Sequence, residues 1–143
     1  MERTGRDVDA FLRDLEGARA DAMRDLDRVI AAELGGLERV LWEGVFWGGT
    51  EQSIIGYGGI TQPRPRGSAV DWFMVGLARQ STHVSVYVNA AEDGGYLVQR
   101  YAGRLGRVRV GSAAITITDV GRLDLDGFTE LLRRARDLTP DVR

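Results

Sequence analysis

Residues 83–88 read HVSVYV, with valine at every second position. Successive side chains of a β-strand point to opposite faces of a sheet, so the three valines are expected on one face and the residues between them on the other. This alternation is typical of an antiparallel strand with one face on a hydrophobic core and the other toward solvent. The residues expected on the second face are His83, Ser85 and Tyr87.

Two stretches before this strand also predict β-structure. Residues 72–78, WFMVGLA, are almost continuously apolar, which is typical of a central strand covered on both faces. Residues 43–59, EGVFWGGTEQSIIGYGG, are rich in glycine but lead into further strand residues, whereas a phosphate-binding loop leads into a helix. We therefore interpret these glycines as bulges or close backbone contacts within a sheet.

Both ends of the chain predict helices, because apolar residues there recur at helical spacing. Thr4 and Asp7 form a predicted capping signal for the first helix, and Gly17 is expected to break the pattern. The fold class is therefore predicted to be α+β: a single domain, residues 1–143, with a mainly antiparallel sheet and the N- and C-terminal helices packed on one face. The helical stretches are residues 8–15, 22–34 and 128–135, and residues 95–104 also place Leu97, Val98 and Tyr101 at helical spacing.

Composition limits the function classes that need to be considered. The 143-residue chain has no cysteine and one histidine, which excludes disulfides, thiolate chemistry and a site built on several imidazoles of one chain. A net charge of −2 argues against general nucleic-acid binding, which needs a clustered positive surface. The sequence has neither an 18-residue apolar run nor a secretory signal, so we expect a cytoplasmic protein with no membrane or nucleic-acid partner.

Several segments resemble one family in order and spacing. Glu43, Val45, Trp47 and Gly48 follow an E-x-I-x-W-G pattern, and IGYG at 55–58 and DWFMVGLA at 71–78 match the next two strands. LGRVRVGSAAITIT at 105–118 and LDLD at 123–126 complete the series. Over residues 40–136 the chain thus resembles the YdhG-like domains of unknown function, some of which are described as frataxin-like intracellular iron chaperones. The resemblance implies a two-layer sandwich and iron handling as a role.

The chain departs from the family pattern at two places. Thr50 stands where the family usually has proline, and Gly111 to Ala114 stand where the family continues Gly-Lys-Ser-Cys. An activity that depends on that lysine, serine and cysteine cannot be carried by this chain. We therefore predict a non-enzymatic binding domain, with iron as the ligand that the resemblance suggests.

Strand alternation predicts a polar surface on the face away from the helices. If Ile115 and Ile117 point inward, Thr116 and Thr118 point outward, and the same rule places two arginines outward beside them. Such a surface could bind a small anionic ligand or serve as an enzymatic site, with the arginines as anion clamps, a serine as donor and the histidine as acid or base. A homodimer or protein-interaction module and an ordinary solvated face are the other interpretations. The candidate ligand-binding residues are His83, Ser85, Tyr87, Arg107, Arg109, Ser112 and Trp47.

Acidic residues near the N-terminus form a candidate metal site. Asp21 and Asp25 are one helical turn apart, and Asp14 would lie near the same stripe if Gly17 did not interrupt the helix. Carboxylate oxygens suit iron or another hard cation. Interleaved arginines favour the alternative of a solvated helix face with surface ion pairs. The predicted pairs are Asp9–Arg13, Asp21–Arg24 and Asp25–Arg28.

Overall fold

The computed structural model describes residues 1–45, 49–63 and 65–143. The helices are α1 (Val8–Asp14), α2 (Ala20–Glu33), α3 (Leu97–Arg100) and α4 (Leu125–Asp137), with short 3-10 helices at η2 (Ala102–Arg104) and η3 (Val120–Arg122). The strands are β1 (Glu2–Thr4), β2 (Arg39–Val45), β3 (Glu51–Gln62), β4 (Val70–Arg79), β5 (Val84–Val88), β6 (Ala91–Glu92), β7 (Gly95–Tyr96), β8 (Arg109–Val110) and β9 (Ala114–Ile117).

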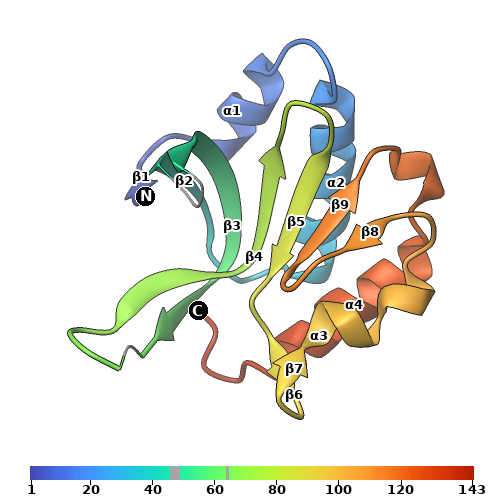
Figure 1. Ribbon diagram of the computed structural model, residues 1–143. Coiled ribbons are helices and arrows are strands. Elements are labelled where there is room, and N and C mark those ends of the chain that lie inside the picture. Colours follow the sequence, from blue (N-terminus) through green and yellow to red (C-terminus); the bar gives the residue numbers. More distant parts are fainter. Residues whose placement is uncertain (46–48, 64) are drawn as a thin grey trace.

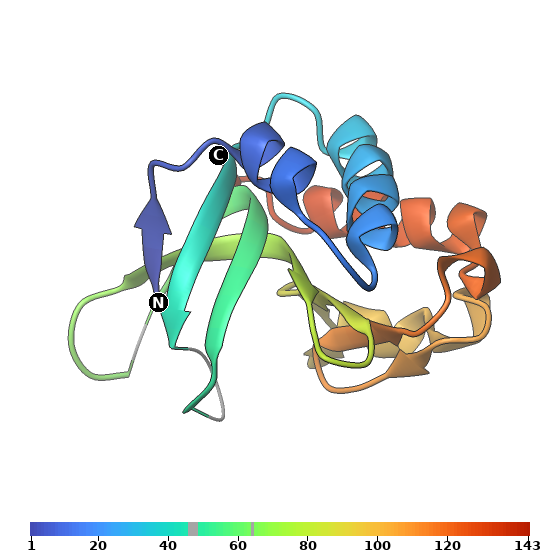
Figure 2. The same ribbon diagram turned by 90° about the horizontal axis from the view of Figure 1, so that it is seen from above.

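Seven strands form one sheet in the order β1-β2-β3-β4-β5-β9-β8, and every neighbouring pair is antiparallel. Helices α1, α2 and α4 lie on one side of this sheet, as the view from above shows (Figure 2). The β3–β4 hairpin extends away from the helices at one side of the molecule (Figure 1). The predicted α+β class and the mainly antiparallel sheet are confirmed.

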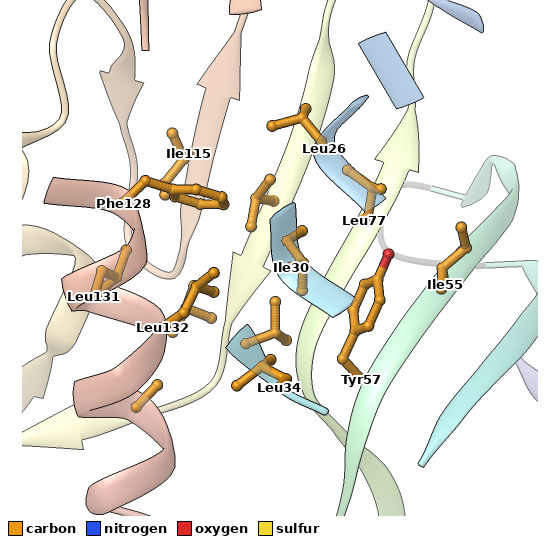
Figure 3. Close-up of a cluster of buried hydrophobic side chains, with 14 of the residues drawn as sticks. Leu26, Ile30, Leu34, Ile55, Tyr57, Leu77, Ile115, Phe128, Leu131 and Leu132 are labelled. Carbon is orange, nitrogen blue, oxygen red and sulfur yellow. The ribbon is translucent and has the colours of Figure 1, made fainter. Parts of the chain in front are cut away.

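The main hydrophobic core lies between the sheet and the three covering helices. Leu26 and Ile30 of α2 and Phe128 and Leu131 of α4 pack in it together with strand residues (Figure 3). Val86 of β5 is fully buried in this core, and the other two valines of the same strand join it. The prediction that these valines point toward the helices is therefore confirmed.

Strand β4 is central in the sheet and is covered on both faces. Val75 and Leu77 belong to the core under the helices, whereas Phe73 and Ala78 belong to a second apolar cluster. All four side chains are buried. This agrees with the prediction from the nearly continuous apolar sequence of β4.

The start of α1 follows one of the two capping residues predicted for it. Asp7 caps α1 by accepting a hydrogen bond from the backbone N–H of Ala10 at 3.1 Å, as predicted. The capping role predicted for Thr4 is wrong, because Thr4 ends β1 and its hydroxyl donates to the carbonyl of Leu41. Gly17 has a positive φ of 83° and separates α1 from α2.

A buried ion pair joins helix α2 to the sheet. Arg39 of β2 donates to both carboxylate oxygens of Asp27, from Nε at 3.0 Å and from Nη2 at 2.7 Å. The hydroxyl of Tyr57 on β3 donates to Oδ1 of Asp27 at 2.7 Å. Asp9 of α1 pairs with Nη1 of Arg39 at 2.9 Å, so one guanidinium connects two helices and the sheet. The pair predicted between Asp9 and Arg13 is wrong for this reason.

The surroundings of this network shift two pKa values. Burial, followed by the negative charge of Asp27, raises the pKa of Tyr57 well above its usual value. Burial alone would lower the pKa of Arg39, but its hydrogen bonds and charge interaction with Asp27 raise the pKa further. The network therefore favours a protonated Tyr57 phenol and a charged Arg39 guanidinium.

We expect Asp27→Asn to lower the free energy of unfolding by about 3 kcal/mol, because the variant leaves the partly buried Arg39 charge with only the exposed carboxylate of Asp9 as counter-ion. The measurement is urea unfolding followed by circular dichroism. Asp25→Asn on the same helix is the matched control, since Asp25 forms only an exposed pair with Arg28 and should change stability by less than about 0.5 kcal/mol. Equal losses in the two variants would contradict a structural role for the network.

Candidate functional site

A row of side chains crosses the sheet on the face without helices. In the strand register Ala78 of β4 lies opposite Ser85 of β5, Ser85 lies opposite Thr116 of β9, and Thr116 lies opposite Arg109 of β8. Directly opposed residues of antiparallel strands have neighbouring side chains on the same face. The structure therefore brings Ser85, Thr116 and Arg109 side by side, as the alternation predicted.

His83 and Tyr87 flank Ser85 along the chain. The side chain of Tyr87 is partly buried, and its hydroxyl lies 3.3 Å from the Nε2 donor of Gln80. His83 is also partly buried and lies in the β4–β5 turn, where its Nδ1 is 3.1 Å from the hydroxyl of Thr82. The described contacts of His83 include no carboxylate, so the orienting acid of a catalytic pair is absent from the part of the chain that the structure describes.

The interpretation of the helix-free face as an ordinary solvated face is wrong over β2, β3 and β4. There a second apolar cluster covers the sheet, formed by Trp42, Ile54, Phe73 and Ala78. The rings of Trp42 and Trp72 meet edge-on with centroids 5.2 Å apart. Ser85 is only 6% exposed, so it lies at the border of this cluster. The polar surface is thus confined to β5, β9 and β8.

Glycines in the strands make room for these aromatic rings. A Cβ atom on Gly56 would lie 2.7 Å from Nε1 of Trp42, and one on Gly76 would lie 2.5 Å from Cε1 of Phe73. Both glycines are therefore places where a ring lies directly on the backbone. The interpretation of the glycine-rich segment as sheet is confirmed for its described residues, which lie mostly in β2 and β3.

The remaining candidates lie around the short β8–β9 hairpin. Arg107 and Arg109 are exposed, and neither side chain has an ion pair or hydrogen bond with any described residue. Arg107 precedes β8, and Ser112 lies in the turn at the opposite end of the hairpin, where its carbonyl accepts a hydrogen bond from Gln99. Only Arg109 therefore lies in the row with Ser85. Trp47 lies outside the described residues.

The candidate metal ligands are paired with arginines. Asp21, whose side chain is 97% exposed, pairs with Arg24 at 3.4 Å, and Asp25 pairs with Arg28 at 3.1 Å. Both pairs were predicted. Asp14 does not share their stripe, because α1 ends at Asp14 and Gly17 interrupts the helical pattern, which is the condition under which the sequence placed it apart. Residues 1–45, 49–63 and 65–143 contain no group of three or more histidine, aspartate or glutamate side chains that could hold a metal ion.

The sequence analysis missed two residues, Asp27 of the buried ion pair and Gln80 beside Tyr87. Asp27 carries a detectable signal, because it lies at helical spacing from the apolar residues Met23 and Ile30 and must therefore face the core. Gln80 carries none, since it lies in a turn and its contacts with Tyr87 and Gln52 depend on tertiary structure. The polar surface itself offers the exposed guanidinium of Arg109 and the partly buried hydroxyl of Thr116 to a ligand, which suits an anionic group.

We expect Gly76→Ala to destabilise the protein by about 1–3 kcal/mol, because the added methyl group overlaps a ring that is itself stacked on Trp72 at 4.4 Å. Gly103→Ala is the control, since its Cβ would meet no atom within 4 Å. Thermal unfolding of both variants is the measurement. A Gly76→Ala protein as stable as the control would show that the Phe73 ring does not rest on the strand.

Comparisons with models of known families, with curated proteins and with solved structures found no match for this chain. The resemblance to the YdhG-like domains therefore stays a prediction from the residues quoted for it. Within the described part of the chain, no helix has the length and apolar character needed to cross a bilayer.

Proposed function

We propose that the protein is a non-enzymatic binding domain that recognises an anionic ligand on the polar part of its helix-free sheet face. Arg109 supplies the positive charge, and the partly buried hydroxyl of Thr116 supplies a neighbouring hydrogen-bond donor, with the buried Ser85 beside it. Arg107 lies just before the same strand and adds a second charge. Guanidinium groups bind carboxylates and phosphates with two parallel hydrogen bonds, which hydroxyl donors can extend.

The observation that carries this proposal is the contrast between these arginines and the others. Most arginines of the described chain pair with a carboxylate, including Arg104 with Glu130 and Arg122 with Asp119 close to the same hairpin. Arg107 and Arg109 have no carboxylate partner among the described residues. Their charge is therefore available to an external anion.

Other functions rest on fewer observations. Iron handling in a YdhG-like or frataxin-like sandwich follows from the resemblance alone, and its two candidate ligands, Asp21 and Asp25, already have arginine partners. An enzymatic role for His83 lacks an orienting carboxylate among its described contacts. A homodimer would use the same sheet face, and a cytoplasmic location follows from the sequence expectations. These functions stay predictions.

Anionic metabolites at about ten times Kd should raise the Tm by about 4 °C, since binding then stabilises the native state by about 1.4 kcal/mol. We expect Arg107→Ala/Arg109→Ala to lose this rise for every carboxylate or phosphate that causes it. A thermal-shift screen at low salt is the measurement, because salt screens exposed charges.

Arg66→Ala is the matched control for this screen. Arg66 is also exposed and also has no ion pair among the described residues, but it lies in the β3–β4 loop outside the proposed surface. The control should keep the full rise in Tm. Hits that persist in the double variant, or that disappear equally in Arg66→Ala, would contradict the proposed binding surface.

A further inference from the structure

A cavity of about 320 Å³ lies at the end of the sheet where α1 meets the start of β3 and the end of β4. Its volume is at the lower end of the range for small-molecule sites. Helix α1 and the β4–β5 turn lie at this same end of the molecule (Figure 1). The lining residues that matter for its chemistry are Phe11, Leu15, Glu51, Ser53, Arg79 and Ser81.

The guanidinium of Arg79 is held in place with one edge unused. Its Nη1 donates to the carbonyl of Glu16 at 2.6 Å and to that of Ala18 at 3.3 Å, which accounts for both hydrogens on that nitrogen. Nε and Nη2 have no partner among the described residues. Neither nitrogen is buried, so both are accessible to a ligand. These two nitrogens form the fork that binds a carboxylate with two hydrogen bonds.

A carboxylate without an ion-pair partner among the described residues lines the same cavity. Glu51 is exposed and forms no ion pair within the described residues. The paired register of β3 and β4 ends at Ile54 and Ala78, and its continuation by one residue puts Ser53 opposite Arg79 and Glu51 at the diagonal position, which agrees with all three lining the cavity. Diagonal neighbours in a sheet are about 7–8 Å apart, so a small molecule can bridge the two charges.

The other walls define the rest of the ligand. Phe11 of α1 and Leu15, which directly follows α1, are partly buried and present apolar surface, and the hydroxyl of Ser53 donates to Glu43 at 3.0 Å. Arg19 adds positive charge near the cavity, because its Nη2 donates to the carbonyl of the lining residue Ser81. The buried Nε of Arg19 has no partner among the described residues. The cavity thus combines a cationic fork, a separate anion and an apolar wall.

We propose that this cavity is a binding site for a small zwitterion, namely a free α-amino acid with an apolar side chain. The ligand carboxylate binds the Nε and Nη2 edge of Arg79, its ammonium group binds Glu51, and its side chain packs on Phe11 and Leu15. A simple anion would be repelled by Glu51, and a simple amine by Arg79. The site is separate from the anion-binding surface proposed above, which lies on the other face of the sheet and contains none of these residues.

Calorimetric titration with the twenty standard amino acids tests this proposal, with leucine as the reference probe. We expect saturable leucine binding, and affinities at least about tenfold lower for 3-methylbutylamine and 4-methylpentanoic acid, which each lack one of the charged groups. Glu51→Gln should lower leucine affinity about tenfold and raise the affinity for 4-methylpentanoic acid, because its carboxylate is no longer repelled. Arg79→Lys keeps the charge but loses the fork, and should weaken leucine by a similar factor.

Asp141→Asn is the matched control, because Asp141 is an exposed carboxylate far along the chain and lines a different hollow. Its leucine affinity should equal that of the unmodified protein. Thermal unfolding of each variant checks that the fold is retained. Absence of saturable binding for all twenty amino acids at 10 mM, about the weakest useful affinity, would overturn the proposal. Leucine binding that Glu51→Gln leaves unchanged would overturn it equally.

Discussion

The pleat of strand β5 is the constraint on which the rest of the structure depends. Because its side chains alternate between faces, burying Val84, Val86 and Val88 under the helices forces the residues between them onto the opposite face. Strand β9 repeats the alternation with Ile115 and Ile117 in the core. Burial of these apolar side chains under the helices therefore determines which residues of β5 and β9 can contact a ligand.

The two faces of the sheet are stabilised in different ways. On the helix side, apolar packing is combined with the Asp27–Arg39–Tyr57 network, which connects α2 to β2 and β3. On the other side, aromatic rings rest on Gly56 and Gly76, so side chains of the sheet itself cover β2 to β4. The polar surface begins where this aromatic cover ends. The two proposed sites lie on opposite faces but share the β4–β5 hairpin, since Arg79 ends β4 and Ser85 lies in β5.

Sequence periodicity predicted the fold class and the direction of the β5 side chains because both depend on local alternation. It predicted the Asp21–Arg24 and Asp25–Arg28 pairs for the same reason. It predicted that β4 is covered on both faces but missed which residues cover the second face, since Trp42, Ile54 and Phe73 come from three strands whose register is set by tertiary pairing. The cavity beside Arg79 was equally hidden, because its walls come from α1, β3 and β4. Periodicity shows which way a side chain points but not what approaches it from another element.

The direction of the β9 side chains tests the account most directly. Because the chain has no cysteine, a single introduced thiol can be followed by itself. Thr116→Cys and Ile117→Cys place a thiol at adjacent positions on opposite faces, and their reaction with a thiol reagent under native conditions is the measurement. The account predicts rapid modification of Thr116→Cys and protection of Ile117→Cys by at least about a thousandfold, because a core position reacts only on global unfolding. Equal rates, or faster modification of Ile117→Cys, would contradict it.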